Sequence, residues 1–233
     1  MNRTAYKCVI FDLDHTLWDY DNNCAEALRE LYIQHELQEK GIETFDKLLS
    51  LFLEVNTQMW DQYDLGFIQR DVIRYQRFHR ILKALGVDDY RLSLEMSANY
   101  VALSPTKKNL LPNAKLILDY LKENYQLMII TNGFEEIQSV KLSSSGIDKY
   151  FEKVITSESV GHKKPAREIF EVALSHGSYS PDEVIMIGDN LNTDIKGANN
   201  IGMDSAYFNP LRRPHAVQVK YEISDLIELK SIL

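Results

Sequence analysis

Carboxylate side chains follow two apolar runs that lie far apart in this 233-residue chain. Asp12 and Asp14 come directly after an apolar run near the N-terminus, and Asp189 and Asp194 follow another near the C-terminus. In one crevice of low dielectric, these like charges would repel each other strongly unless a cation were present. We therefore expect a divalent metal ion. A ligand set of oxygens, without His or Cys at ligand spacing, favours Mg²⁺, or another divalent cation such as Mn²⁺, over Zn²⁺.

Two further segments carry residues suited to binding phosphate. Thr131 and Asn132 end an apolar run, and Lys164 lies in a segment with a second lysine, Lys163. A metal ion and one lysine could together accept a phosphate dianion that bare carboxylates would repel. Thr131 and Asn132 could instead simply cap the helix expected after them. The two lysines are alternatives, because adjacent lysines often only solvate a loop.

These residues need a scaffold that brings distant segments together, and the chain pattern predicts a parallel α/β sheet. Short β-rich runs occur at 6–11, 127–130, 153–155, 184–187 and 205–208, with amphipathic segments near 113–124, 134–145, 166–176 and 192–200. A last strand and helix are expected after Lys220. Strand–helix alternation builds a parallel sheet covered on both faces, and ligands bind at the carboxyl ends of its strands. The polar segments should therefore converge.

Residues 17–104 follow a different pattern from the rest of the chain. All six prolines lie at position 105 or later, and residues 17–104 contain only three glycines. Apolar residues recur there at helical spacing, which predicts several helices. The fold class is therefore α/β, with a Rossmann-like parallel-sheet core made of residues 1–16 and 105–233. An α-helical cap domain of residues 17–104 is inserted after the first strand.

Composition excludes several classes of function. The chain has 26 Lys and Arg against 34 Asp and Glu, a net charge of −8. We therefore expect no nucleic-acid polymer as partner, since neutralising many phosphates takes clustered basic residues. Nothing approaches the roughly 20 apolar residues of a membrane span. Two cysteines, Cys8 and Cys24, and an N-terminus without a signal-peptide core predict a cytoplasmic protein that does not bind membranes.

The polar segments, taken in order, resemble the haloacid dehalogenase-like (HAD-like) hydrolase superfamily, whose first motif is Asp-x-Asp-x-Thr. The resemblance is carried by Asp12-Leu13-Asp14-His15-Thr16, Thr131-Asn132, Lys164-Pro165 and Gly188-Asp189 with Asp194. It implies a phosphatase in which Asp12 is the nucleophile and forms an aspartyl phosphate, while Asp14 is the general acid and base. It also implies that Mg²⁺ is ligated by Asp12 and by the backbone carbonyl of Asp14.

The same resemblance assigns the remaining polar residues. Thr131 and Asn132 would bind the phosphate, and Lys164 would neutralise charge on it as a catalytic residue. Asp189 would complete the Mg²⁺ ligands. Asp194 would be a water-mediated ligand or an orienting group, and bonding to the loop backbone is its structural alternative.

More narrowly, the chain resembles one branch of the superfamily. The insertion after the first motif is similar to the helical cap of type I members. Residues 11–19, 131–134 and 188–195 resemble the YjjG-like pyrimidine 5′-nucleotidase group. This implies a small phosphorylated metabolite, a pyrimidine nucleoside monophosphate, as substrate. His15, Trp18 and Phe67 are candidates for the substrate pocket. The rings of Trp18 and Phe67 are suited to stacking on a base, although most aromatic residues of the cap should pack the cap helices together.

Other activities are compatible with the same residues. Asp14 argues against carbon–halogen cleavage, because a halide leaves without a proton and the name-giving dehalogenases lack this acid. A small sugar phosphate or phosphoglycolate could replace the nucleotide, because the residues of the catalytic core do not select the leaving group. A phosphomutase would pass the phosphoryl group to a sugar. A phosphate-binding signalling receiver is a non-hydrolytic alternative, which the long cap and Asp14 disfavour.

Overall fold

The computed structural model describes residues 6–233, which form two compact units. Residues 6–20 together with Lys108–Leu233 form one unit, and Asp21–Lys107 form the other. Among the described residues, no helix combines the length and the apolar character that crossing a membrane requires.

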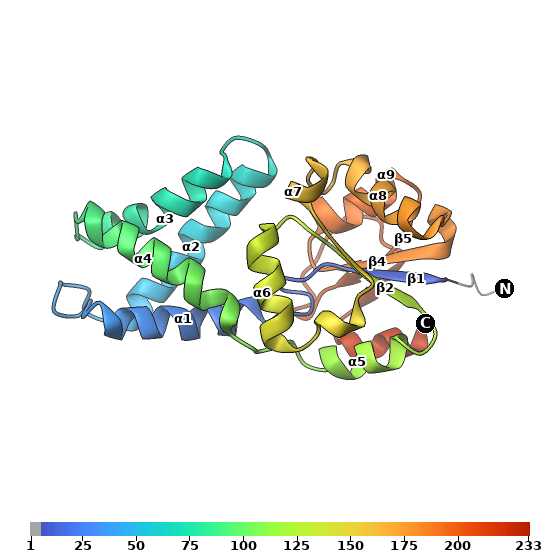
Figure 1. Cartoon of the computed structure of the whole chain (residues 1–233), viewed down its shortest axis with the longest axis horizontal. Helices are drawn as coiled ribbons and strands as arrows, with labels where there is room; N and C mark the ends of the chain where they lie inside the picture. The colour runs from blue at the N-terminus through green and yellow to red at the C-terminus, as the bar shows by residue number, and fades with distance from the viewer. Residues whose placement is uncertain (1–5) are drawn as a thin grey trace. The chain divides into compact units, whose positions relative to one another are not determined.

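Within residues 6–233, the first unit is built on a six-stranded sheet (Figure 1). Its strands are β1 (Cys8–Phe11), β2 (Gln126–Thr131), β3 (Lys153–Thr156), β4 (Val184–Gly188), β5 (Asp204–Phe208) and β6 (Tyr221–Ile223). Their order is β3-β2-β1-β4-β5-β6, and every neighbouring pair is parallel. The winding direction therefore reverses beside β1, and such a switch point opens a crevice at the carboxyl ends of the strands.

Helices cover both faces of this sheet, which confirms the predicted fold class. They are α5 (Ala114–Leu121), α6 (Glu135–Ser145), α7 (Ser157–Val160), α8 (Arg167–Gly177) and α9 (Lys196–Asn200), with short helices η2 (Asp148–Tyr150), η3 (Pro181–Glu183) and η5 (Leu226–Ser231). Val9 and Phe11 of β1 share a core with α5, α6 and η5. Cys8 and Ile10 face the other way and share a core with α8 and α9. Burial on both faces explains why β1 is a continuous apolar run.

The segment after β4 differs from the single helix expected over 192–200. A five-residue π-helical turn, η4 (Leu191–Ile195), comes first and α9 follows it. The Asn190 side chain accepts hydrogen bonds from backbone N–H groups two and three residues later, at 2.9 and 3.3 Å. The Asp194 side chain turns back to accept a hydrogen bond from the Asn190 N–H at 3.0 Å. These side-chain contacts accompany the irregular turn, and such turns are frequent at functional sites.

The second unit is helical. Its elements are α1 (Tyr20–Gln34), α2 (Phe45–Asp64), α3 (Arg70–Ala84), α4 (Tyr90–Leu103) and the short η1 (Ser104–Thr106). Thr44 and Asp89 begin α2 and α4 by accepting hydrogen bonds from backbone N–H groups three residues later. Phe52, Phe78 and Tyr100 pack together, with ring centroids 5.0–5.6 Å apart. These three rings therefore pack the helices, as expected for most aromatics of this segment.

Candidate active site

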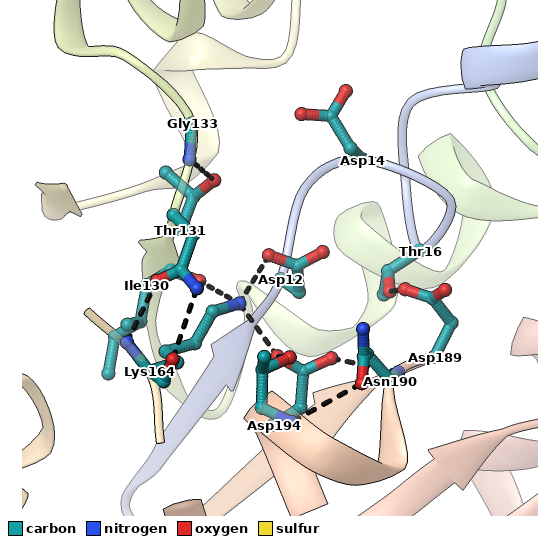
Figure 2. A network of polar contacts seen from close by, with 12 residues as sticks. Asp12, Asp14, Thr16, Ile130, Thr131, Gly133, Lys164, Asp189, Asn190 and Asp194 are labelled. Carbon is teal, nitrogen blue, oxygen red and sulfur yellow. Dashed lines mark hydrogen bonds and ion pairs between the residues drawn. The ribbon is translucent and has the colours of Figure 1, made fainter. Parts of the chain in front are cut away.

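Asp12 follows β1, and its carboxylate is buried beside Lys164. Lys164 Nζ donates a hydrogen bond to Asp12 Oδ1 at 2.5 Å and lies 2.7 Å from Asp194 Oδ1 (Figure 2). Nζ also donates to the carbonyl oxygen of Ile130 at 3.0 Å. The Lys164 side chain is only 3% exposed. Lys164, one of the two lysines considered from the sequence, is therefore the one that contacts Asp12.

A third carboxylate completes a cluster with Asp12 and Asp194. Asp12, Asp189 and Asp194 each place a carboxylate oxygen within 4.8 Å of the others. Asp189 Oδ1 accepts a hydrogen bond from Thr16 Oγ1 at 3.0 Å. The last residue of the Asp-x-Asp-x-Thr motif thus holds the aspartate that follows β4.

The cluster carries more negative charge than its one lysine can balance. Burial raises the pKa of Asp12 to about 8 although Lys164 opposes the shift, and Asp194 and Asp189 add to it. Burial, with Asp194, also raises the pKa of Asp189 to about 7. Burial alone would lower the pKa of Lys164, but Asp12 and Asp194 outweigh it and raise that pKa. All three shifts express the same arrangement, a cluster of three carboxylates of which only Asp12 and Asp194 contact the Lys164 ammonium.

This arrangement fits a divalent cation. Buried charges are costly unless they are paired, and one ammonium leaves the cluster short of positive charge. The donor set consists of hard oxygen atoms, which Mg²⁺ and Mn²⁺ prefer. Asp12, Asp189 and Asp194 are the side chains that could hold the ion. The side chain of Asp14 does not belong to this cluster.

The Asp14 carboxylate points away from Asp12 (Figure 2) and contacts α6 instead. Lys141 Nζ donates a hydrogen bond to Asp14 Oδ1 at 2.6 Å, and Gln138 Nε2 donates to Oδ2 at 2.9 Å. Burial raises the pKa of Asp14, but Lys141 and Gln138 outweigh it, and the pKa is lowered. Asp14 is therefore ionised in this structure, which is the form that accepts a proton from water.

Gln138 and Lys141 are site residues that the sequence analysis did not identify. Both lie in a helix whose other polar residues are largely exposed. From the sequence alone, they are therefore indistinguishable from residues of a solvent-exposed helix face. The available signal was their spacing of three residues, which places them on the same helix face. That face also carries the buried Leu142, one residue further on.

Thr131 and Asn132 follow β2 and make different contacts. Thr131 Oγ1 accepts hydrogen bonds from Gln138 Nε2 at 2.7 Å and from the Gly133 N–H at 3.0 Å. Asn132 bonds to the main chain of Lys164: its Oδ1 accepts from the Lys164 N–H at 2.8 Å, and its Nδ2 donates to the Lys164 carbonyl at 3.1 Å. Asn132 thereby fixes the segment that carries Lys164.

The three pocket candidates lie in different environments. His15 is exposed, has a φ of 61°, and its ring centroid lies 4.7 Å from that of Tyr20. Trp18 is fully buried, with the Lys141 ammonium 4.4 Å from its ring centroid. Phe67 is 77% exposed and belongs to the helical unit. Stacking of Trp18 or Phe67 on a base stays a prediction, and for Trp18 it would require the ring to become exposed.

Comparison with known proteins identifies similar chains of nearly the same length. The family described as haloacid dehalogenase-like hydrolase matches residues 6–202. The chain is 30% identical over 228 residues to the pyrimidine 5′-nucleotidase YjjG of Escherichia coli, covering 97% of this chain and 96% of YjjG. It is 29% identical over 235 residues to the glyceraldehyde 3-phosphate phosphatase of Methanothermobacter thermautotrophicus, covering 97% and 99%. The crystal structure of Bacillus subtilis YfnB bound to magnesium superposes with a TM-score of 0.88 at 28% identity, covering 97% and 98%.

Proposed function

Since the chain belongs to the haloacid dehalogenase-like hydrolase family and is a phosphatase of that family, we propose that it hydrolyses pyrimidine nucleoside monophosphates through an aspartyl phosphate. The observation that carries the mechanism is the buried Asp12 carboxylate, hydrogen-bonded to Lys164 and clustered with Asp189 and Asp194. Both cysteines, Cys8 and Cys24, are buried as thiols, which supports a reducing, cytoplasmic compartment.

In the first step, a carboxylate oxygen of Asp12 attacks phosphorus. The bond from phosphorus to the leaving oxygen breaks as the bond to Asp12 forms, and Asp14 gives its proton to the leaving oxygen. Lys164 stabilises the charge on the phosphoryl oxygens. Because Lys141 and Gln138 hold Asp14 ionised, Asp14 takes up that proton from solvent as the substrate binds. Negative charge on the substrate favours this uptake, since a nearby like charge raises the pKa of a carboxyl group.

In the second step, water attacks the phosphorus of the aspartyl phosphate. Asp14, again a carboxylate, takes a proton from the water as its oxygen bonds to phosphorus. The bond between phosphorus and the Asp12 oxygen breaks, which releases inorganic phosphate and restores the Asp12 carboxylate. A divalent cation held by Asp12, Asp189, Asp194 and the backbone carbonyl of Asp14 would neutralise charge on the phosphoryl oxygens.

Thr131 and Asn132 complete the proposal for the phosphate. The Thr131 hydroxyl donates to a phosphoryl oxygen. Asn132 acts mainly by holding the Lys164 segment, because both ends of its amide already bond to that main chain.

The choice of substrate rests on similarity over nearly the whole chain. The relative YjjG is named as a pyrimidine 5′-nucleotidase, and the match to it includes the helical unit. The second candidate is a small sugar phosphate, which the equally long match to a glyceraldehyde 3-phosphate phosphatase supports. Both substrates would meet the same catalytic residues, so those residues do not distinguish them.

Phosphate release from a panel of substrates tests the proposal. The panel contains UMP, dUMP, dTMP, purine nucleotides, glyceraldehyde 3-phosphate and phosphoglycolate, each with Mg²⁺ and with a chelator. We expect the highest kcat/KM for the pyrimidine nucleotides, and loss of activity in chelator. Activity confined to the sugar phosphates would contradict the nucleotidase assignment and leave the phosphatase assignment intact. Full activity in chelator would contradict the proposed requirement for a divalent cation.

A further inference from the structure

Two buried polar side chains of α6 contact the site without taking part in either proposed step. Gln138 is fully buried and Lys141 is 5% exposed. Burying an amide or an ammonium costs free energy unless each group has specific partners. The partners found here are Asp14 and Thr131, two residues with assigned roles in the proposed reaction.

Gln138 joins these two residues through one nitrogen atom. Its Nε2 donates hydrogen bonds to Asp14 Oδ2 at 2.9 Å and to Thr131 Oγ1 at 2.7 Å. Its Oε1 has no hydrogen-bond partner among the described residues. An ionised carboxylate only accepts hydrogen bonds, so Nε2 rather than Oε1 has to face Asp14. The amide orientation is therefore set by Asp14.

This orientation also determines what the Thr131 hydroxyl can do. Its oxygen accepts hydrogen bonds from Gln138 Nε2 and from the Gly133 N–H. A hydroxyl group has two acceptor positions and one proton. Because both acceptor positions are used, the Thr131 proton is directed elsewhere and remains available to a phosphoryl oxygen.

Gly133 leaves the space that the Gln138 amide occupies. A Cβ at position 133 would lie 2.1 Å from Gln138 Nε2 and 2.5 Å from its Cδ. Side chains do not approach a Cβ that closely, so any larger residue would displace the amide. The glycine in the Thr131-Asn132-Gly133 segment is thus explained by the glutamine on the following helix.

Lys141 controls the other oxygen of Asp14. Its Nζ donates to Asp14 Oδ1 at 2.6 Å and lies 4.4 and 5.7 Å from the ring centroids of Trp18 and Tyr20. The two rings stabilise the buried ammonium by cation–π contact. Each oxygen of Asp14 therefore receives one donor from α6, and two such donors fix the rotation of the carboxylate.

We propose that Gln138 and Lys141 are positioning residues, which hold Asp14 as the hydrogen-bond acceptor for the attacking water and leave the Thr131 hydroxyl to donate to the phosphoryl group. The inference rests on the proposed function. It identifies the step that should fail. A leaving group such as 4-nitrophenolate departs without a proton. Formation of the aspartyl phosphate from 4-nitrophenyl phosphate therefore depends little on Asp14 as a general acid. Hydrolysing the aspartyl phosphate still needs it.

Rapid mixing with 4-nitrophenyl phosphate separates the two steps. In Gln138→Leu and Lys141→Met, we expect kcat to fall about 10–100-fold. This is less than the whole rate enhancement that a general base contributes, because Asp14 is still present but no longer held in position. Nitrophenolate should appear in a larger initial burst per active site than in the parent, because the aspartyl phosphate accumulates. KM should fall together with kcat in Lys141→Met. Inorganic phosphate should inhibit Gln138→Leu more weakly, since the Thr131 donor loses its orientation.

Three further variants make the test specific. Lys141→Arg keeps a cationic donor and should recover most of kcat. Ser139→Ala and Lys115→Met change exposed residues of α6 and α5 and should behave as the parent. Gly133→Ala displaces the Gln138 amide without changing Gln138 or Lys141, and should also enlarge the burst. It keeps the inference testable if a variant of either α6 residue does not fold.

The kinetics distinguish a positioning role from a structural one. A lower kcat with unchanged KM and a burst no larger than that of the parent would overturn the inference, and so would parental kinetics in Gln138→Leu, Lys141→Met and Gly133→Ala. A parent that releases no nitrophenolate would overturn the proposed function as well. A parent that is active and loses activity in Asp12→Asn keeps the proposed function, so that a negative result for the α6 variants then counts against this inference alone.

Discussion

The carboxylate of Asp194 lies against the backbone of Gly188 at the carboxyl end of β4. A Cβ on Gly188 would lie 2.2 Å from Asp194 Oδ2 and 2.5 Å from its Cγ. In this position Oδ2 accepts a hydrogen bond from the Asn190 N–H at 3.0 Å, while Oδ1 lies 2.7 Å from Lys164 Nζ. One carboxylate thus bonds to the loop backbone, the structural alternative considered for Asp194, and also contacts the lysine of the site.

Gly188→Ala should disrupt this arrangement, because the new methyl group and the Asp194 carboxylate cannot both fit. We expect the free energy of unfolding to fall by about 1–3 kcal/mol, as for overpacking of a buried site. Phosphate release should fall as well, since Asp194 has to move relative to Lys164. Urea denaturation and a phosphate assay measure both effects. A variant with parental stability would contradict the close contact.

Asp12→Asn should separate catalysis from folding. The amide is nearly the same size as the carboxylate but cannot attack phosphorus, so turnover should fall by more than about a thousandfold. The melting temperature in chelator should stay the same or rise, because the change removes one of three clustered carboxylates. The burial that raises the pKa of Asp12 to about 8 shows that its charge is unfavourable there. A large loss of stability in chelator would contradict this account of the cluster.

Much of the core fold could be predicted because its signals are local. β1 (Cys8–Phe11) is buried on both faces, so it reads as an unbroken apolar run within the predicted 6–11. The helix expected near 134–145 is observed as Glu135–Ser145, which ends at Gly146 in a left-handed conformation. The π-helical turn at Leu191–Ile195 could not be predicted, because it depends on the side chains of Asn190 and Asp194 turning back onto the loop.

The site residues that could be predicted either follow the end of a strand, as Asp12 and Asp189 do, or lie in the motifs that carry the family resemblance, as Lys164 and Asp194 do. Asp12 and Asp189 come together because parallel strands bring their carboxyl ends to one edge. Gln138 and Lys141 lie 124 and 127 residues from Asp14 in the sequence. Their spacing of three residues places them on one face of α6, but only the packing of α6 beside the first motif brings them into contact with Asp14.

Glu183, in the segment before β4, forms an ion pair with Lys7, the residue before β1, and its contribution to stability should depend on pH. A hydrogen bond from the Lys7 side chain, and then one from the Ser180 N–H, lower the pKa of Glu183 to about 2 from 4.5. A carboxyl whose folded pKa is lowered stabilises the fold above about pH 4.5, and this stabilisation is lost as the pH falls toward 2. Glu183→Gln should therefore lower the melting temperature at pH 7, and the difference from the parent should shrink at pH 3. Asp182→Asn is the matched control at an exposed neighbouring position. A difference that does not change with pH would contradict the assignment.

The clustered carboxylates of Asp12, Asp189 and Asp194, with one ammonium beside them, should make the folded chain bind a divalent cation, whether or not substrate is present. Mg²⁺ added after chelation should raise the melting temperature, because a ligand that binds only the folded state stabilises it by about 2.7 kcal/mol at a hundred times its Kd. Asp189→Asn removes one oxygen ligand and one charge, so the shift caused by Mg²⁺ should become smaller. Without metal, this variant should melt no lower than the parent, since burial raises the pKa of Asp189 to about 7 and its charge is already unfavourable. Glu123→Gln changes an exposed residue outside the carboxylate cluster and is the control. It should keep the full rise in melting temperature caused by Mg²⁺. An equal shift in Asp189→Asn and in the parent would mean that Mg²⁺ binds elsewhere.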